Sequence, residues 1–284
     1  MIKKILVAVA GRGLCEEMLN MMLDIPSFQK ASVTLLHVVS PEVSSDTMSE
    51  KLTEAGKILA EAVTSIKLDP KQINPLLKQG DPKDIVCQVA NEEDVDLIIM
   101  GSRGLGRLQA ILENSVSQYV FQLTSHPMLL VKDDTYVKKL RKIMVAVDNS
   151  EASKQCLQLA ISFAKDIAGT QLILVHINKD ISGKSSEDFS NNAEKDPILA
   201  PAIEEVKRMG IGYRCVSGIG KPGPELCRVA EELNPDLLML GSPDRRPNVA
   251  KSFIDLDRLL GSSLSDYVRV YANCPVLLAR TTAK

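Results

Sequence analysis

The sequence predicts an α/β protein built from two tandem Rossmann-like domains, each a five-stranded parallel sheet with helices on both faces. Three observations carry this prediction: an internal repeat, alternating strand and helix patterns in each half, and apolar β-branched strands typical of parallel sheets. The length of 284 residues suits two domains of about 100–200 residues each. We expect the domains at residues 1–136 and 140–284, joined by the polar segment 132–140.

The repeat consists of three blocks that recur in the same order. The paired blocks, with their offsets in residue number, are Lys3–Ala10 and Arg141–Asp148 (138), Gly80–Ser102 and Gly220–Ser242 (140), and Ser117–Lys132 and Ser265–Arg280 (148). The rise of the offset from 140 to 148 places about eight extra residues in the second half, between Asp244 and Gly261. Three collinear blocks of this length indicate a duplicated domain.

Hydrophobic periodicity gives the same alternation in both halves. Strands are predicted at 5–9, 33–39, 73–78, 97–100 and 128–131, and at 143–147, 172–177, 213–216, 237–240 and 276–279. Helices are predicted at 14–23, 49–66, 81–93 and 115–123, and at 150–168, 198–209, 224–233 and 263–272. Asp81 is a candidate N-cap, with Pro82 at the first helical position. Such alternation predicts right-handed crossovers and a parallel sheet in each half.

Composition excludes several classes of protein. A formal charge of −2 and a pI near 6.0 give no basic footprint, so no nucleic-acid partner is expected. The six cysteines are scattered and resemble small buried hydrophobes, and the three histidines lack zinc-site spacing. No apolar stretch approaches the roughly 18 residues of a membrane span. We therefore expect a soluble, cytoplasmic protein without a membrane partner.

The fold predicts where a ligand would bind. In an open parallel sheet, ligands bind beyond the carboxyl ends of the strands, where the strand order switches. After the fourth strand comes Met100-Gly101-Ser102-Arg103-Gly104, then nine residues, then Asn114-Ser115-Val116-Ser117. Glycines let the backbone approach a phosphate, and the helix that begins near Ser115 offers free N–H groups and hydroxyls. Together they predict an anion cradle.

These segments resemble the universal stress proteins. The loop GSRGLGRLQAILENS is similar to the G-x2-G-x9-G-[S/T] pattern of ATP-binding members, with Gly101, Gly104 and Ser115 matching and Asn114 in place of a glycine. The stretches KKILVAVA, LLHV, GDPKDIV, DLIIMGSRG and HPMLLVK also resemble that family. The resemblance covers nearly the whole chain, once per half. It implies a tandem UspA-like protein with an adenine nucleotide alpha hydrolase-like fold that binds ATP or AMP, with Mg²⁺ as a further candidate ligand.

Each half departs from the family pattern in a different place. The family's first strand usually ends in an Asp that contacts the nucleoside; the second half keeps Asp148, whereas the first half has Ala10. In the second half, Asp244 replaces the second glycine, and a carboxylate there would repel a phosphate by about 4 kcal/mol. The adjacent Arg245 and Arg246 are candidates to offset that repulsion or to contact the phosphate themselves. Asn114 is a milder change, because asparagine tolerates the left-handed region at a cost of about 1 kcal/mol. The first half is therefore the expected nucleotide site.

The resemblance then assigns the site residues. Adenine contacts are expected from Ala8, Ala10 and the backbone at Val38, and phosphate contacts from the loop and helix start. The full candidate set is Ala8, Ala10, Val38, Met100, Gly101, Arg103, Gly104, Asn114, Ser115, Val116, Ser117, Asp148, Gly241, Ser262 and Ser263.

Structural explanations stand beside these roles. The two loop glycines would also suit a tight strand-to-helix turn without a ligand. Ser115, Ser117 and Ser150 are equally suited to helix capping. His37 and His176 occupy equivalent strand positions and are expected to be packed in the core.

Two classes of function follow. The first is a universal stress protein that binds adenine nucleotide and acts in stress response or regulation. The alternative is a tandem scaffold whose segments 182–196, an expected loop, and 245–260 bind a protein partner. Slow ATP hydrolysis ranks third, because Asp148 is the one residue of the sequence that can be named as a general base or a metal ligand. In this family single domains pair through their last strands, so we expect 128–131 beside 276–279 as an internal pseudo-dimer, in a monomer or a homodimer.

Overall fold

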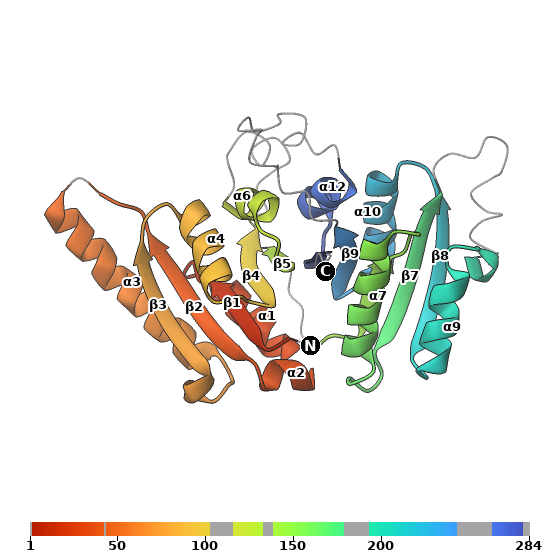
Figure 1. Cartoon of the computed structure of the whole chain (residues 1–284), viewed down its shortest axis with the longest axis horizontal. Helices are drawn as coiled ribbons and strands as arrows, with labels where there is room; N and C mark the ends of the chain where they lie inside the picture. The colour runs from red at the N-terminus through yellow and green to blue at the C-terminus, as the bar shows by residue number, and fades with distance from the viewer. Residues whose placement is uncertain are drawn as a thin grey trace. The chain divides into compact units, whose positions relative to one another are not determined.

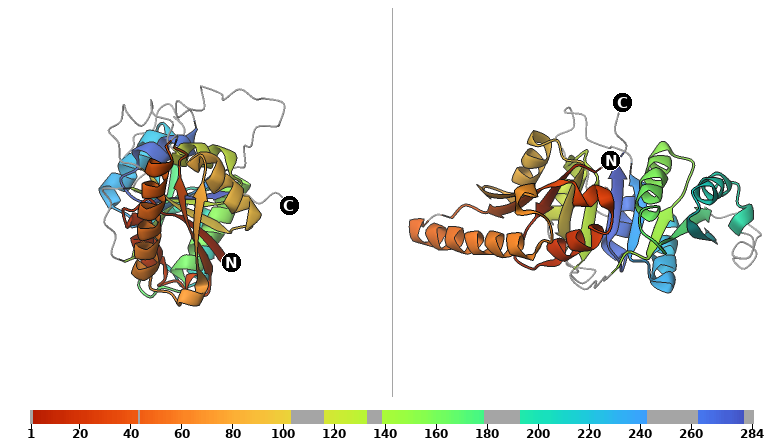
Figure 2. Two further views of the ribbon diagram at one scale, coloured as in Figure 1. Left: turned by 90° about the vertical axis from the view of Figure 1, so that its left-hand side faces the viewer. Right: turned by 90° about the horizontal axis from the view of Figure 1, so that it is seen from below.

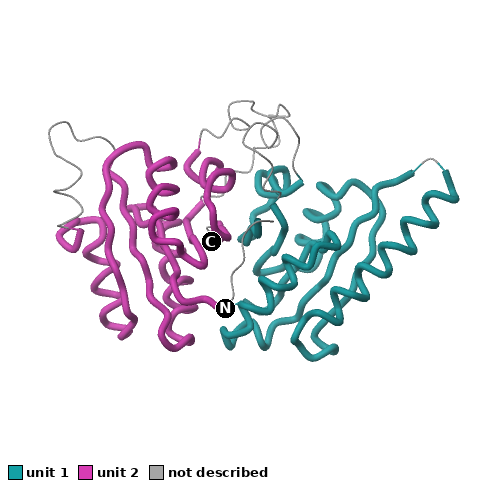
Figure 3. Tube along the Cα trace, turned by 180° about the vertical axis from the view of Figure 1, so that it is seen from behind, with its two compact units in different colours: residues 1–134 teal, residues 135–284 magenta. Residues whose placement is uncertain are grey.

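The structure is a computed structural model that describes residues 2–42, 44–102, 116–132, 139–178, 193–242 and 263–280. The chain divides into two compact units, residues 1–134 and 135–284 (Figure 3). Each unit carries its own parallel sheet and its own set of helices (Figure 1).

The first unit alternates strands and helices along the chain. Its elements are β1 (Lys4–Ala8), α1 (Leu14–Met22), α2 (Pro26–Gln29), β2 (Ser32–Val39), α3 (Ser45–Ser65), a 3-10 turn (Pro70–Gln72), β3 (Ile73–Gln79), α4 (Pro82–Glu92), β4 (Leu97–Ser102), α6 (Val116–Leu123) and β5 (Met128–Lys132). The strand order is β3-β2-β1-β4-β5, with every neighbouring pair parallel. Strands β2 and β3 therefore lie on one side of β1, and β4 and β5 lie on the other, which puts the switch point between β1 and β4.

The second unit repeats this arrangement. Its elements are β6 (Lys142–Ala146), α7 (Glu151–Ala164), β7 (Gln171–Asn178), a 3-10 turn (Ala193–Lys195), α9 (Ala200–Arg208), β8 (Gly212–Ile219), α10 (Pro222–Leu233), β9 (Leu237–Ser242), α12 (Leu264–Tyr271) and β10 (Val276–Arg280). The order β8-β7-β6-β9-β10 is again fully parallel and puts the switch point between β6 and β9.

Helices cover both faces of each sheet (Figure 2). In the first unit α1 and α3 pack on one face, and α4 and α6 on the other. In the second unit α7 and α9 face α10 and α12 across the sheet. The predicted fold class, two five-stranded parallel sheets with helices on both faces, is confirmed.

The strand sequences explain this layering. Strands β1, β4, β6 and β9 lie in the interior of each sheet and are buried on both faces, so nearly all their residues are apolar. Leu6, Val7, Ile98 and Ile99 have no exposed surface at all. The largest fully buried side chains are two phenylalanines from helices, Phe28 of α2 in the first unit and Phe163 of α7 in the second.

The helix ends agree with the capping predictions in part. Asp81 caps α4 by accepting the N–H of Lys83 at 2.9 Å, with Pro82 in the first position, as predicted. Helix α7 ends at Ala164 and not at 168, and the chain continues through turns to Gly169, whose φ of +77° is left-handed. The short helix α2 was not predicted, since four residues are too few to show a period.

Candidate functional site

The candidate site lies at the carboxyl edge of the first sheet, where β1 separates β2 from β4. Ala8 is the register partner of Leu36 on one side and Met100 on the other. The N–H of Val9 donates to the Leu36 carbonyl at 2.8 Å and holds the end of β1 against β2. The fold thus brings Ala8, Val38, Met100 and Gly101 to one edge, around the switch point where a ligand is expected.

Part of the predicted cradle falls outside the described residues. Arg103, Gly104, Asn114 and Ser115 of the first unit and Ser262 of the second are in this group. Val116 opens helix α6, and the neighbouring Ser117 is buried in its first turn. The positions of the cradle that the structure does describe are therefore its two ends, the end of β4 and the start of α6.

The turn after the first strand differs between the units. In the first unit Ala10 is exposed, and the turn runs through Gly11 and Gly13, with φ of 73° and 74°. In the second unit the Asp148 carboxylate accepts the N–H of Ser150 at 2.7 Å. Ser150 in turn caps α7 by accepting the N–H of Ser153 at 3.1 Å. The capping role considered for Ser150 is confirmed.

Ser153 holds this turn in place and was missed from the sequence. Its hydroxyl accepts the N–H of Asp148 at 2.9 Å and donates to the Ala146 carbonyl at 3.3 Å. It therefore joins the end of β6 to the first turn of α7. The repeat places Cys15 at this position in the first unit, where a thiol is a much weaker hydrogen-bonding group. Comparing the two repeats position by position would have indicated the difference.

The paired histidines are structural. The Nδ1–H of His37 donates to the Val9 carbonyl at 2.8 Å, and that of His176 donates to the Val147 carbonyl at the same distance. Both rings are half-buried, and each ties the residue after the first strand of its unit to the second strand. The expectation that they are packed in the core is met only in part, since both rings are half-buried and not fully buried.

The equivalent glycines Gly101 and Gly241 meet different surroundings. A Cβ on Gly241 would lie 2.3 Å from the carbonyl carbon of Ala152 and 2.5 Å from the nitrogen of Ser153, so helix α7 requires a glycine there. A Cβ on Gly101 would meet, among the described residues, only the Cys15 sulfur at 3.9 Å. Packing thus explains the glycine in the second unit and not in the first.

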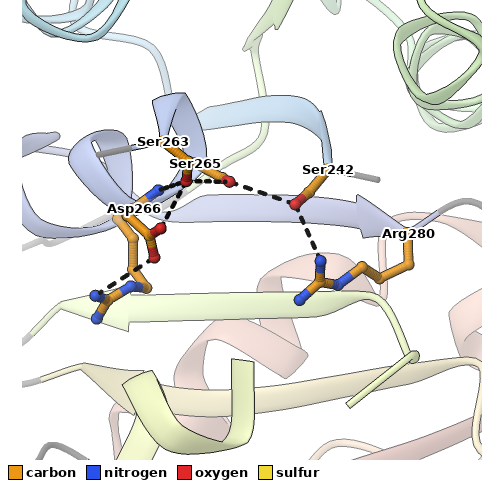
Figure 4. Close-up of polar contacts among 6 residues, drawn as sticks. Ser242, Ser263, Ser265, Asp266 and Arg280 are labelled. Carbon is orange, nitrogen blue, oxygen red and sulfur yellow. Dashed lines mark hydrogen bonds and ion pairs between the residues drawn. The ribbon is translucent and has the colours of Figure 1, made fainter. Parts of the chain in front are cut away.

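The second unit shows a chain of hydroxyls at the start of α12 (Figure 4). Ser263 caps the helix: its Oγ accepts the N–H of Asp266 at 3.2 Å and donates to the Asp266 carboxylate at 2.6 Å. Ser265 Oγ lies 3.2 Å from Ser263 Oγ and 3.4 Å from Ser242 Oγ. Ser242 also accepts a hydrogen bond from Arg280, at 3.1 Å. Of these residues, only Ser263 belongs to the predicted set.

A second polar cluster, also missed, lies where β7 and β8 end. Asp196 is 8 % exposed, and its carboxylate accepts the Ser217 hydroxyl at 2.6 Å and the Ile198 N–H at 2.9 Å. The Asn178 amide contacts both Asp196 and Ser217. The repeat aligns Ser217 with an apolar residue of the first unit, Leu77, so the cluster belongs to the second unit alone.

The first unit contains a buried carboxyl group. Glu16 is 4 % exposed in the first turn of α1. Its pKa is raised because burial removes water from the carboxylate, and the neighbouring Glu17 adds to the effect. The backbone N–H groups of Glu16 and Cys15 oppose the rise. The carboxylate therefore carries a free-energy cost when it is ionised.

Two further properties of the described residues bear on the chemistry. Within the residues that the structure describes, no three His, Cys, Asp or Glu side chains are grouped so as to hold a metal ion. No helix in the described part of the chain has the length and apolar character of a membrane span.

Comparison with known proteins identifies the family. The model of the universal stress protein family matches residues 1–132 and again residues 139–280. Universal stress protein YxiE of Bacillus subtilis is 28 % identical over 148 residues, which is 46 % of this chain and all of that protein. A universal stress protein of Methanothermobacter thermautotrophicus is 30 % identical over 143 residues, 46 % of this chain and 97 % of that protein.

A solved structure shows the same tandem architecture. The crystal structure of a universal stress protein from Archaeoglobus fulgidus aligns with a TM-score of 0.75 at 22 % identity, covering 98 % of this chain and 96 % of that one. At this identity the likeness concerns the fold. Because the family model accounts for nearly the whole chain, once in each unit, this chain belongs to the universal stress protein family.

Proposed function

We propose that this protein is a nucleotide-binding universal stress protein whose first unit binds ATP or AMP and which acts in stress response or regulation. The observation that carries the proposal is the contrast between Gly101 and Gly241. The loop of the first unit begins with a glycine that has open space among the described residues. A glycine kept where packing does not require it suits the close approach of a ligand to the backbone.

The carboxyl edge of the first sheet supports the same assignment. Ala8, Val38 and Met100 lie together at the switch point, directly before the loop that carries Gly104, Asn114 and Ser115. A nucleoside over the strand ends would place its phosphates toward that loop and the N-terminus of α6.

In the second unit, each described candidate already has a role within the protein. Asp148 accepts a backbone N–H, Gly241 makes room for α7, and Ser263 caps α12. Asp244, which replaces the second glycine of the pattern, adds a negative charge to the same loop. The second unit is therefore the weaker candidate for the nucleotide site.

Exchange of one residue in each loop tests the proposal. Equilibrium binding of ATP would be measured on the full chain, with and without Mg²⁺, for the wild type, Gly104→Leu and Asp244→Leu. We expect Gly104→Leu to weaken binding by at least about tenfold, because a side chain there blocks the approach of a phosphate. Asp244→Leu is the matched control and should keep the wild-type affinity. Unchanged binding by Gly104→Leu, with the fold intact by circular dichroism, would exclude the first unit as the site.

A further inference from the structure

The turn that follows the first strand of the first unit is tied to the second strand at Val9. The N–H of Val9 donates to the Leu36 carbonyl at 2.8 Å, and the Val9 carbonyl accepts the Nδ1–H of His37 at 2.8 Å. Both backbone groups of Val9 are therefore held by β2. Because the peptide bond is planar, fixing the Val9 carbonyl also fixes the direction of the Ala10 N–H, which lies in the same plane.

The Ala10 N–H is the backbone donor that this geometry directs. Among the described residues it has no acceptor, and Ala10 itself is exposed. In the second unit the equivalent N–H, that of Asp148, donates to the Ser153 hydroxyl at 2.9 Å. The first unit therefore leaves a donor of fixed direction at a position where the second unit satisfies the same donor within the protein.

The side chains around this turn differ between the two units. In the second unit the Asp148 carboxylate accepts the N–H of Ser150, which in turn caps α7. The methyl group of Ala10 cannot make the first of these bonds, and α1 begins after Gly13 without a side-chain hydrogen bond at its N-cap. Two side-chain bonds of the second turn are thus missing from the first, whereas the histidine bond is present in both.

We propose that His37 is a positioning residue of the nucleotide site: through the Val9 carbonyl it directs the Ala10 N–H, and the turn that follows, toward the nucleoside. This inference rests on the proposed function of the first unit and adds to it a residue outside the candidate set. His37 acts through Val9 and needs no contact with the ligand. Because Ala8 and Ala10 belong to the nucleoside end of the candidate site, the effect concerns the nucleoside and not the phosphates.

Side chains that keep or remove the donor test this role. Dissociation constants of AMP and ATP would be measured on the full chain, well below its melting temperature, for the wild type, His37→Phe, His37→Leu and His37→Asn. Phenylalanine and leucine cannot donate a hydrogen bond, whereas the asparagine amide can place an N–H near the position of Nδ1. We expect the first two variants to weaken AMP and ATP by the same factor, about fivefold, which corresponds to one neutral hydrogen bond. His37→Asn should stay within about twofold of the wild type.

The second unit supplies the matched control. His176 donates to the Val147 carbonyl at the same distance of 2.8 Å, so His176→Phe removes the same bond from the other unit. This variant should bind AMP and ATP as the wild type does. Thermal unfolding of both phenylalanine variants measures how much the bond supports the fold, and the loss of affinity should be confined to His37→Phe.

The outcomes distinguish the two proposals. Wild-type affinity in His37→Phe and His37→Leu would overturn the inference and leave the nucleotide function standing. A loss for ATP alone, a loss in His37→Asn as large as in His37→Phe, or equal losses in His37→Phe and His176→Phe would overturn it as well. Failure of both His37→Phe and His37→Leu to fold would mean that the fold itself requires the bond, and would also overturn the positioning role. If the wild type bound neither AMP nor ATP, the proposed function would fail, and the inference with it.

Discussion

Gly241 lies so close to Ala152, in the first turn of α7, that a Cβ on the glycine would come within 2.3 Å of the alanine carbonyl carbon. Its repeat partner Gly101 has no such neighbour, since among the described residues only the Cys15 sulfur comes within 4 Å of the same point. Two glycines that align in the repeat therefore have different steric surroundings. Helix packing requires the glycine at 241, and no described residue imposes the same requirement at 101.

This contrast predicts that the same substitution destabilises one site much more than the other. Gly241→Ala should lower the free energy of unfolding by about 1–3 kcal/mol, because the methyl group must displace backbone of α7. Gly101→Ala should change it by less than about 0.5 kcal/mol, the usual range for a site without such a contact. Urea unfolding of the two variants, side by side, measures both. Equal stabilities would show that α7 can shift freely and that the packing explanation is wrong.

The hydroxyl of Ser153 gives a second prediction. Ser153→Ala removes the acceptor for the Asp148 N–H and the donor to the Ala146 carbonyl, so stability should fall by about 1–2 kcal/mol. Ser162→Ala is the control on the same helix, because its hydroxyl only donates to the nearby Leu159 carbonyl. Thermal unfolding of both variants checks the difference. A control as destabilised as Ser153→Ala would argue against a special role for this serine.

The buried cluster around Asp196 gives a third prediction. Ser217→Ala leaves one oxygen of a buried carboxylate without its 2.6 Å donor, which should cost about 1–3 kcal/mol. Ser32→Ala, at an exposed serine of the first unit with a long 3.4 Å bond, is the control and should be nearly neutral. Denaturant unfolding measures both. A neutral Ser217→Ala would mean that another donor, such as the Asn178 amide, can satisfy Asp196.

Glu16 predicts how stability depends on pH. Its folded pKa lies above its unfolded value, so between the two values the folded state binds more protons than the unfolded state. Stability from this group is therefore greatest at low pH and is lost as the pH rises through the folded pKa. Glu16→Gln should raise the melting temperature at pH 7–8, and the gain should shrink toward pH 4–5. Glu61→Gln, at an exposed glutamate of α3, is the control; a gain from Glu16→Gln that did not vary with pH would contradict the account.

Much of the fold could be predicted because it depends on local pattern. Buried strands such as Leu97–Ser102 are almost entirely apolar, and the repeat requires both halves to adopt the same topology. The Asp81-Pro82 pair marks a helix start by its own chemistry. The order of the strands was not predicted, because alternation with right-handed crossovers is compatible with several orders of five parallel strands.

The contacts that hold the site could not be predicted, because their partners are distant in the sequence. Arg280 donates to a serine 38 residues earlier, and Ser217 donates to a carboxylate 21 residues earlier. The sequence pattern predicts Gly241 as a ligand contact. The structure gives a steric reason for this glycine, its close approach to the backbone of α7. The ligand contacts, the cytoplasmic location, the domain limits and the oligomeric state stay predictions.

The most direct test of the account is calorimetric titration of the full chain, freed of nucleotide, with ATP up to millimolar concentration. The account predicts saturable binding near one equivalent per chain, because only the first unit keeps a loop suited to phosphate. No heat of binding at several temperatures would contradict the nucleotide function, and two equivalents would contradict the restriction of binding to the first unit.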